Sequence, residues 1–300
     1  MTISRRQFLE LCRNSAPALG LTAVQLTQLE KLLANPTAPS VVWLQGSACT
    51  GCSVSLLNRV STTRPTDIAD VLINYVNLRY HPNLMALAGE PAAAIAEEYR
   101  TKTGQIVAME GGVPTAFGGS TCWAWSYKGR DVTMLEAVQA LGKTASQILC
   151  VGTCAAWGGI PAAAPNPTGV RGVSAVTGRP TLNIAGCPPH PDWIVWAIAN
   201  LLLGTVGRVD QYGRPVALYS RTVHNQCPRR ERGEASTYGQ DLRCLEELGC
   251  QGPHTVAPCP TSLWNNRQNW CVDANSQCIG CTNPTFPGTS LRRNSDGDDD

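Results

Sequence analysis

Residues 41–52 read VVWLQGSACTGC, and this stretch decides the fold. Its first four residues form a short apolar run typical of a buried strand. Gly46 begins the loop that carries Cys49 and Cys52, and a helix-like stretch follows at residues 54–58. A strand that runs into a loop and then into a helix is the repeating unit of an open α/β sheet.

The same order of strand, loop and helix recurs over the first two thirds of the chain. Residues 105–109 and 148–151 are apolar runs that end near glycine. Thr133, with a glutamate three residues later, predicts the start of a helix that extends to about residue 141. Residues 182–185 form another strand-like run, and a helix is expected at 191–203. The pattern predicts an α/β fold with mostly parallel strands.

Four cysteines follow the ends of three of these expected strands. Loops at the carboxyl ends of parallel strands gather at one edge of a sheet, so thiols far apart in the sequence are expected to meet there. Gly51 is expected to let the Cys-x2-Cys loop turn tightly. Four thiolates suit an iron–sulfur cubane, and the alternative is a redox-active Cys-x2-Cys pair with two buried cysteines. The set is Cys49, Cys52, Cys154 and Cys187.

The last quarter of the chain has a different character, because Gly, Pro, Asn and Cys interrupt every apolar run. It predicts a small, loop-rich domain over residues 205–288 with a thin core held by metal clusters. Eight soft or borderline ligands occur here, which is enough for two sets of four. The sets are His224, Cys227, Cys244 and Cys250, and then Cys259, Cys271, Cys278 and Cys281.

Zinc and disulfides compete with iron–sulfur clusters for these residues. A structural zinc site also takes three cysteines and one histidine, or four cysteines. Disulfides would need an oxidising compartment, but they make no use of Cys-x2-Cys pairs or of a ligand-like histidine. The three sets leave Cys12, Cys122 and Cys150 among the 14 cysteines, and Cys150 is expected to pack inside a strand.

The ends and the net charge indicate where the chain works. Arg5 and Arg6 precede Phe8 and a moderately apolar stretch, so residues 1–39 match a twin-arginine export signal, with an amphipathic helix as the alternative. Residues 289–300 are polar and expected to be disordered. A formal net charge of +2 argues against binding nucleic acid, and no apolar run is long enough to span a membrane.

Five ordered motifs, spread from about Val41 to Pro287, resemble the small, electron-transferring subunit of nickel–iron hydrogenases. The resemblance implies a flavodoxin-like domain over residues 40–204, followed by the cluster domain at 205–288. It implies a separate large subunit that holds the nickel–iron centre. The motifs are Gly46-x2-Cys49-Thr50-Gly51-Cys52-Ser53, Gly152-Thr153-Cys154, Gly186-Cys187-Pro188-Pro189-His190-Pro191, His224-x2-Cys227-Pro228 and Cys278-Ile279-Gly280-Cys281.

The resemblance also implies the function. Three 4Fe–4S clusters would relay electrons between the nickel–iron centre, where H2 = 2 H+ + 2 e−, and an external redox partner. The set that contains Cys49 would hold the proximal cluster, the set that contains Cys259 the medial cluster, and the set that contains His224 the distal cluster. The chain would work in the periplasm with a large subunit and, by analogy, a cytochrome c, and it would carry no catalytic residue. A stand-alone multi-cluster electron carrier is the alternative.

Departures from the family pattern refine this expectation. Many members have proline where this chain has Cys271, and their medial cluster has three irons. Cys271 therefore predicts a medial 4Fe–4S cluster, as in the nickel–iron–selenium members, with 3Fe–4S as the alternative. Extra cysteines of oxygen-tolerant members would fall near Gly51 and Gly159, so an ordinary four-cysteine proximal cluster is expected. Glu110 matches a glutamate that lies near the proximal cluster in family members. The resemblance implies a role beside the cluster or in a proton relay, and the alternative is a loop carboxylate that is simply hydrogen-bonded.

Overall fold

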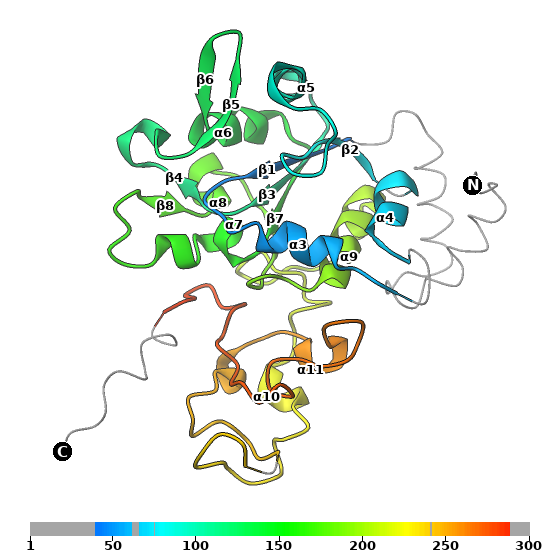
Figure 1. Cartoon of the computed structure of the whole chain (residues 1–300), viewed down its shortest axis with the longest axis vertical. Coiled ribbons are helices and arrows are strands. Elements are labelled where there is room, and N and C mark those ends of the chain that lie inside the picture. Colours follow the sequence, from blue (N-terminus) through cyan, green and yellow to red (C-terminus); the bar gives the residue numbers. More distant parts are fainter. Residues whose placement is uncertain (1–39, 62–65, 75, 241, 289–300) are drawn as a thin grey trace, which may run out of the picture.

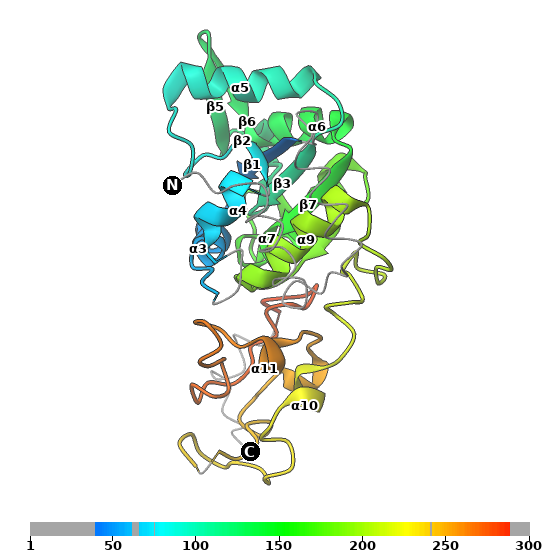
Figure 2. The ribbon, with the colours of Figure 1, turned by 90° about the vertical axis from the view of Figure 1, so that its right-hand side faces the viewer.

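The computed structural model describes residues 40–61, 66–74, 76–240 and 242–288. The expected export signal and the polar tail lie outside these ranges. A sheet surrounded by helices forms one part of the molecule, and a part built mainly of loops lies next to it (Figures 1 and 2).

The sheet has five parallel strands in the order β2-β1-β3-β7-β9. Counted along the chain within this sheet, the order is 2-1-3-4-5, which is the flavodoxin-like order. The prediction of an open, parallel, flavodoxin-like sheet is therefore confirmed. The strands are β1 (Ser40–Gln45), β2 (Asn77–Tyr80), β3 (Ile106–Glu110), β7 (Gln147–Val151) and β9 (Leu182–Ile184).

Side chains of each strand alternate between two apolar cores, one on each face of the sheet. Val41 and Trp43 of β1 belong to one core, whereas Val42 and Leu44 belong to the other. Helices cover both faces, so the strands read as continuous apolar runs. The first face carries α3 (Gly51–Leu57), α4 (Ile68–Asn74) and α9 (Pro191–Leu203). The second carries α5 (Gly89–Thr101), α6 (Met134–Thr144), α7 (Thr153–Trp157) and α8 (Val173–Thr177).

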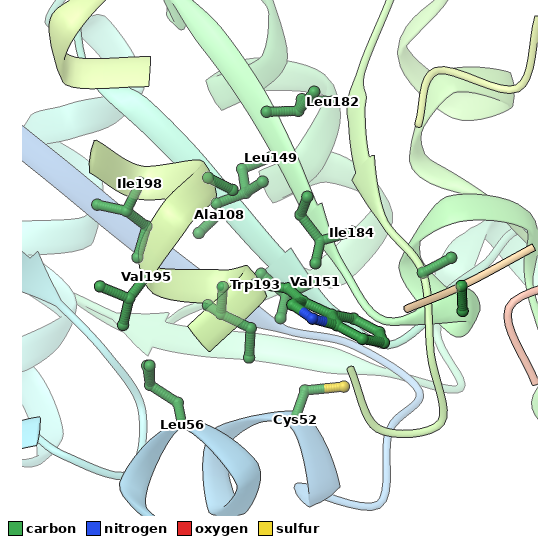
Figure 3. Close-up of a cluster of buried hydrophobic side chains, with 14 of the residues drawn as sticks. Cys52, Leu56, Ala108, Leu149, Val151, Leu182, Ile184, Trp193, Val195 and Ile198 are labelled. Carbon is green, nitrogen blue, oxygen red and sulfur yellow. The ribbon is translucent and has the colours of Figure 1, made fainter. Parts of the chain in front are cut away.

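Helix α9 occupies the residues that the sequence predicts. Pro191 stands in its first turn, where a missing N–H costs nothing, and Gly204 ends the helix with φ 66. The apolar face of α9 packs on the sheet beside α3, and Figure 3 shows Trp193 near the Cys52 side chain of that helix. The helix thereby holds α3 and its cysteine against the core.

Helix α6 begins as predicted, where Thr133 Oγ1 accepts a hydrogen bond from the Glu136 N–H at 3.1 Å. The Glu136 carboxylate does not reach back to Thr133, because it binds Arg100 and Arg130 instead. The capping box is thus half formed.

Four short strands form two antiparallel pairs that are not predicted from the sequence. The pairs are β4 (Val113–Pro114) with β8 (Val170–Arg171), and β5 (Trp123–Tyr127) with β6 (Arg130–Thr133).

The described residues from 205 to 288 are almost entirely loop, as predicted. Their helical turns are α10 (Val223–Gln226), η3 (Gly252–His254) and α11 (Cys259–Ser262). Their apolar side chains, including Tyr219 and Trp270, belong to the same cluster as the first face of the sheet. The two parts therefore share one core, and the expected domain boundary stays a prediction. No helix within the described ranges is long and apolar enough to cross a membrane.

Candidate metal centres

The carboxyl edge of the sheet brings together the four thiols of the first predicted set. Cys49 and Cys52 follow β1, Cys154 lies in α7 directly after β7, and Cys187 follows β9. Burial raises the pKa of the Cys52 thiol well above its usual value, and the charges of the other three thiolates raise it further. Four side chains that follow three separate strands thus face one centre.

The loop between Cys49 and Cys52 turns tightly, and both residues between the two cysteines contribute to the turn. Thr50, rather than Gly51, adopts the left-handed conformation, with φ 66 and ψ 1. Its hydroxyl accepts a hydrogen bond from Gln45 Nε2 at 2.7 Å, which ties the loop to the end of β1. Gly51 begins α3, and a Cβ atom there would lie 3.1 Å from Cys49 Sγ, so its missing side chain leaves room for the tight turn that the sequence predicts.

Two other glycines leave room for the thiols of this set. A Cβ atom on Gly152, where φ is 94, would lie 2.5 Å from Cys52 Sγ. A Cβ atom on Gly159, where φ is 55, would lie 2.8 Å from Cys154 Sγ. Both distances are too short for a real contact, so only glycine keeps this space open beside the sulfur atoms.

Glu110, at the end of β3, lies directly beneath this loop and is buried. Its carboxylate accepts hydrogen bonds from the N–H groups of Cys52 at 2.9 Å and Ser53 at 3.2 Å. The Ser53 hydroxyl lies 2.5 Å away and donates to it as well. Since the side chain of the N-cap residue Thr50 accepts no hydrogen bond from the helix, Glu110 caps helix α3 from the neighbouring strand.

His81 completes this buried network and orients the Ser53 hydroxyl towards Glu110. The His81 Nδ1 atom accepts a hydrogen bond from the Asn83 N–H at 3.1 Å, so the proton of the neutral ring resides on Nε2. That proton points to Ser53 Oγ at 3.2 Å, and Ser53 in turn donates to Glu110. Burial lowers the pKa of His81 to about 4, which keeps the ring neutral at ordinary pH. The Ser53 hydroxyl therefore joins the two backbone N–H groups in donating to the Glu110 carboxylate.

The set that begins at Cys259 forms a second group of facing thiols, in the loop-rich part. Burial raises the pKa of the Cys259 thiol well above its usual value, and the charges of the other three thiolates contribute in the same direction. Burial likewise raises the pKa of Cys278 to about 11 and that of Cys281 to about 12. Cys271 reaches the group from an exposed position.

The set that contains His224 lies at α10 and in the loops after it. Cys227 ends α10, and the charges of the Cys244 and Cys250 thiolates raise the pKa of its thiol beyond the effect of burial. His224, Cys244 and Glu246 offer ligand atoms that all lie within 4.8 Å of one another. Glu246 is not predicted from the sequence, because an exposed glutamate in a loop carries no ligand signal.

Hydrogen bonds join the three sets in series. The backbone of Cys187 forms a hydrogen bond with the Cys281 thiol. The Thr153 hydroxyl donates a hydrogen bond to the Cys281 carbonyl oxygen at 2.5 Å. The Cys278 N–H donates to Cys250 Sγ at 3.3 Å. The set that contains Cys259 thus lies between the other two.

The donor sets fit iron–sulfur clusters. Four thiolates cannot all stay charged in a buried site without a compensating cation, as the raised pKa of about 11 at Cys154 illustrates. Bound metal supplies that positive charge, so thiols of this kind bind metal as thiolates. All 13 cysteines in the described ranges are free thiols, so no disulfide forms among them.

Two cysteines of the described ranges lie outside these sets. Cys150 is completely buried in β7, which confirms the prediction that it packs in the core. Cys122 is half-buried next to the β5–β6 hairpin, and burial raises the pKa of its thiol. Cys12 lies outside the described residues.

Comparisons with known proteins cover both parts of the chain. Residues 49–201 match the family model of the NADH ubiquinone oxidoreductase 20 kDa subunit, and residues 219–292 match the C-terminal model of the NiFe/NiFeSe hydrogenase small subunit. The periplasmic NiFeSe hydrogenase small subunit of Desulfomicrobium baculatum is 36% identical, over 96% of this chain and 97% of that protein. The periplasmic NiFe hydrogenase small subunit of Solidesulfovibrio fructosivorans is also 36% identical, over 95% of this chain and 90% of its own length.

A solved structure shows the same fold. The NiFeSe hydrogenase of Desulfovibrio vulgaris Hildenborough superimposes with a TM-score of 0.78 and 39% sequence identity. The match covers 85% of this chain and 97% of that chain.

Proposed function

Because this chain belongs to the family of NiFe and NiFeSe hydrogenase small subunits, we propose that it relays electrons between the hydrogen-converting centre of a large subunit and an external redox partner. The reaction H2 = 2 H+ + 2 e− takes place in the hydrogenase complex. This chain binds and aligns the redox groups and carries no catalytic residue. The serial hydrogen-bonded order of its three ligand sets is the observation that supports this role most directly.

Each ligand set has a place in the proposed relay. Cys49, Cys52, Cys154 and Cys187 hold the proximal cluster, and Cys259, Cys271, Cys278 and Cys281 hold the medial one. His224, Cys227, Cys244 and Cys250 hold the distal cluster, where a neutral imidazole replaces one thiolate. Each bound 4Fe–4S cluster supplies one-electron redox chemistry. The protein keeps the clusters apart at fixed positions and provides hydrogen bonds to their sulfur ligands.

The medial cluster is proposed to have four irons because of Cys271. The charge of its thiolate raises the pKa of Cys259, Cys278 and Cys281, so its side chain faces the other three ligands. The proximal cluster is proposed to be of the ordinary four-cysteine kind. Gly51 and Gly159 adjoin Cys49 and Cys154, and neither glycine offers a further ligand.

The proposed setting follows the relatives. Their names place them in the periplasm, and Arg5 and Arg6 support export of this chain by the twin-arginine route. A large subunit that carries the nickel–iron centre is the proposed partner in a heterodimer or larger complex. A periplasmic cytochrome c is the proposed electron partner.

Purification from the native host with metal analysis tests the proposal. We expect the chain to copurify with a nickel-containing large subunit and to carry about twelve iron atoms and no zinc. A chain that purifies alone with its clusters would support the stand-alone electron carrier instead. Zinc in place of iron would contradict both functions and indicate a structural metal-binding module.

A further inference from the structure

We propose that two buried charges of opposite sign, Glu110 at the proximal cluster and Arg229 at the distal cluster, set a gradient of reduction potential along the relay. The gradient draws electrons from the proximal towards the distal cluster. This inference rests on the proposed function. It names two residues that favour electron transfer in one direction along the clusters.

At the proximal end, the fixed charge is negative. Glu110 is 1% exposed, and its carboxylate binds the N–H groups of Cys52 and Ser53. The Ser53 hydroxyl donates to it as well, because the His81 ring occupies the acceptor side of that hydroxyl, so three donors converge on the two carboxylate oxygens. An electron that enters the adjacent cluster adds negative charge, and a nearby buried anion opposes it. Glu110 therefore lowers the reduction potential of the proximal cluster.

At the distal end, the fixed charge is positive. Arg229 is 2% exposed, and its backbone N–H donates to Cys227 Sγ at 3.4 Å. Its guanidinium Nη1 donates to the neutral amide oxygen of Asn275 at 3.1 Å, and its Nε has no hydrogen-bond partner among the described residues. A guanidinium is always protonated in proteins. The guanidinium charge also acts on the Cys227 thiol, where it works to lower the pKa against the effect of burial. A buried cation beside a cluster ligand favours the reduced cluster and raises its potential.

Other charges near the distal cluster oppose Arg229 only weakly. Glu246 Oε2 lies 3.6 Å from His224 Nδ1, and both Glu246 and Glu234 act on the Cys244 thiol. Both carboxylates are exposed, so water and salt screen them, whereas the buried guanidinium is hardly screened. The neutral His224 ligand acts in the same direction as Arg229, because it removes one negative charge.

EPR-monitored redox titration of the intact complex tests the gradient. In the unmodified complex, we expect the proximal midpoint potential to lie below the distal one, and the reverse order would overturn the proposal. Glu110→Gln should raise the proximal potential and leave the distal one unchanged. Glu98→Gln, an exposed carboxylate on α5 that pairs with Lys102, is the matched control and should shift neither.

The arginine is tested in the same way. Arg229→Met should lower the distal potential, whereas Arg229→Lys should keep it near the unmodified value because the charge remains. Arg230→Met is the control, since Arg230 is the exposed neighbour. Equal shifts in Arg229→Met and Arg229→Lys, or no shift in either with the cluster intact, would overturn the proposal. A complex without iron–sulfur signals would refute the proposed function itself, and the gradient with it.

Discussion

Gly152→Ala is the substitution that tests the proximal site most sharply. The new Cβ atom would lie 2.5 Å from Cys52 Sγ, whereas ordinary contacts begin at 3.4 Å, so the sulfur or the backbone must move by about 1 Å. The backbone at Gly152, with φ 94 and ψ 157, lies in a region that only glycine adopts readily, which adds about 1–3 kcal/mol of strain.

The surrounding structure cannot absorb this movement. Glu110 holds the backbone N–H of Cys52, and the Cys52 side chain is packed in the core below α9 (Figure 3). A thiolate displaced by about 1 Å no longer meets its cluster with correct geometry. We therefore expect the variant complex to lose the proximal cluster and about a third of its iron.

Gly178→Ala is the matched control. Gly178 also has a positive φ, of 66, but a Cβ atom there would meet nothing within 4 Å. Gly178→Ala should lower the free energy of unfolding by about 1–2 kcal/mol and leave the iron content of the complex unchanged. Iron analysis, EPR of the reduced complex and thermal unfolding measure these outcomes. If Gly152→Ala kept its full iron content and unfolded like Gly178→Ala, the close approach to Cys52 would not matter and the reasoning would be refuted.

Three further predictions concern single residues. Cys271→Pro should remove one medial thiolate, so the oxidised complex should gain a 3Fe–4S EPR signal that the unmodified complex lacks. The pKa of His81 is about 4 in the folded protein and near 6.5 in the unfolded chain. The free energy of unfolding is therefore unaffected by this residue above pH 6.5, and it falls by about 3 kcal/mol as the pH is lowered to 4, because the unfolded chain binds the proton more tightly. Urea unfolding of His81→Gln should therefore depend less on pH in that range. Thr133→Ala should cost about 1 kcal/mol by removing the cap of α6, and a Thr133→Ser variant should recover most of it in thermal unfolding.

The sequence predicts those features whose signal is periodic or local. Apolar runs identify β1, β3, β7 and β9 because both faces of the sheet are covered. Pro191 and Gly204 mark the ends of α9, since each residue has a fixed place at a helix terminus. The convergence of Cys49, Cys154 and Cys187 follows from strand direction alone.

Features that depend on distant partners are not visible in the sequence. Nothing local shows that Glu110 caps a helix that begins 59 residues earlier, or that His81 orients the Ser53 hydroxyl that donates to it. The left-handed turn falls on Thr50 rather than on the glycine beside it, because the Gln45 side chain binds the threonine hydroxyl. Local propensity favours glycine, and a tertiary hydrogen bond overrides it.

The core that continues from the sheet into the loop-rich part has a consequence for the rate of electron flow. Tyr219 and Trp270 pack in the same apolar cluster as Trp193 of α9. A relative movement of the two parts would therefore have to break close packing in a shared core. Tunnelling slows steeply as donor and acceptor separate, and a hinged relay would pass electrons only when thermal motion closed the gap. In this molecule the gap is set by packing. Its internal transfer should therefore proceed at the same rate in water and in a viscous glycerol solution, with only the encounter with the outside partner slowed.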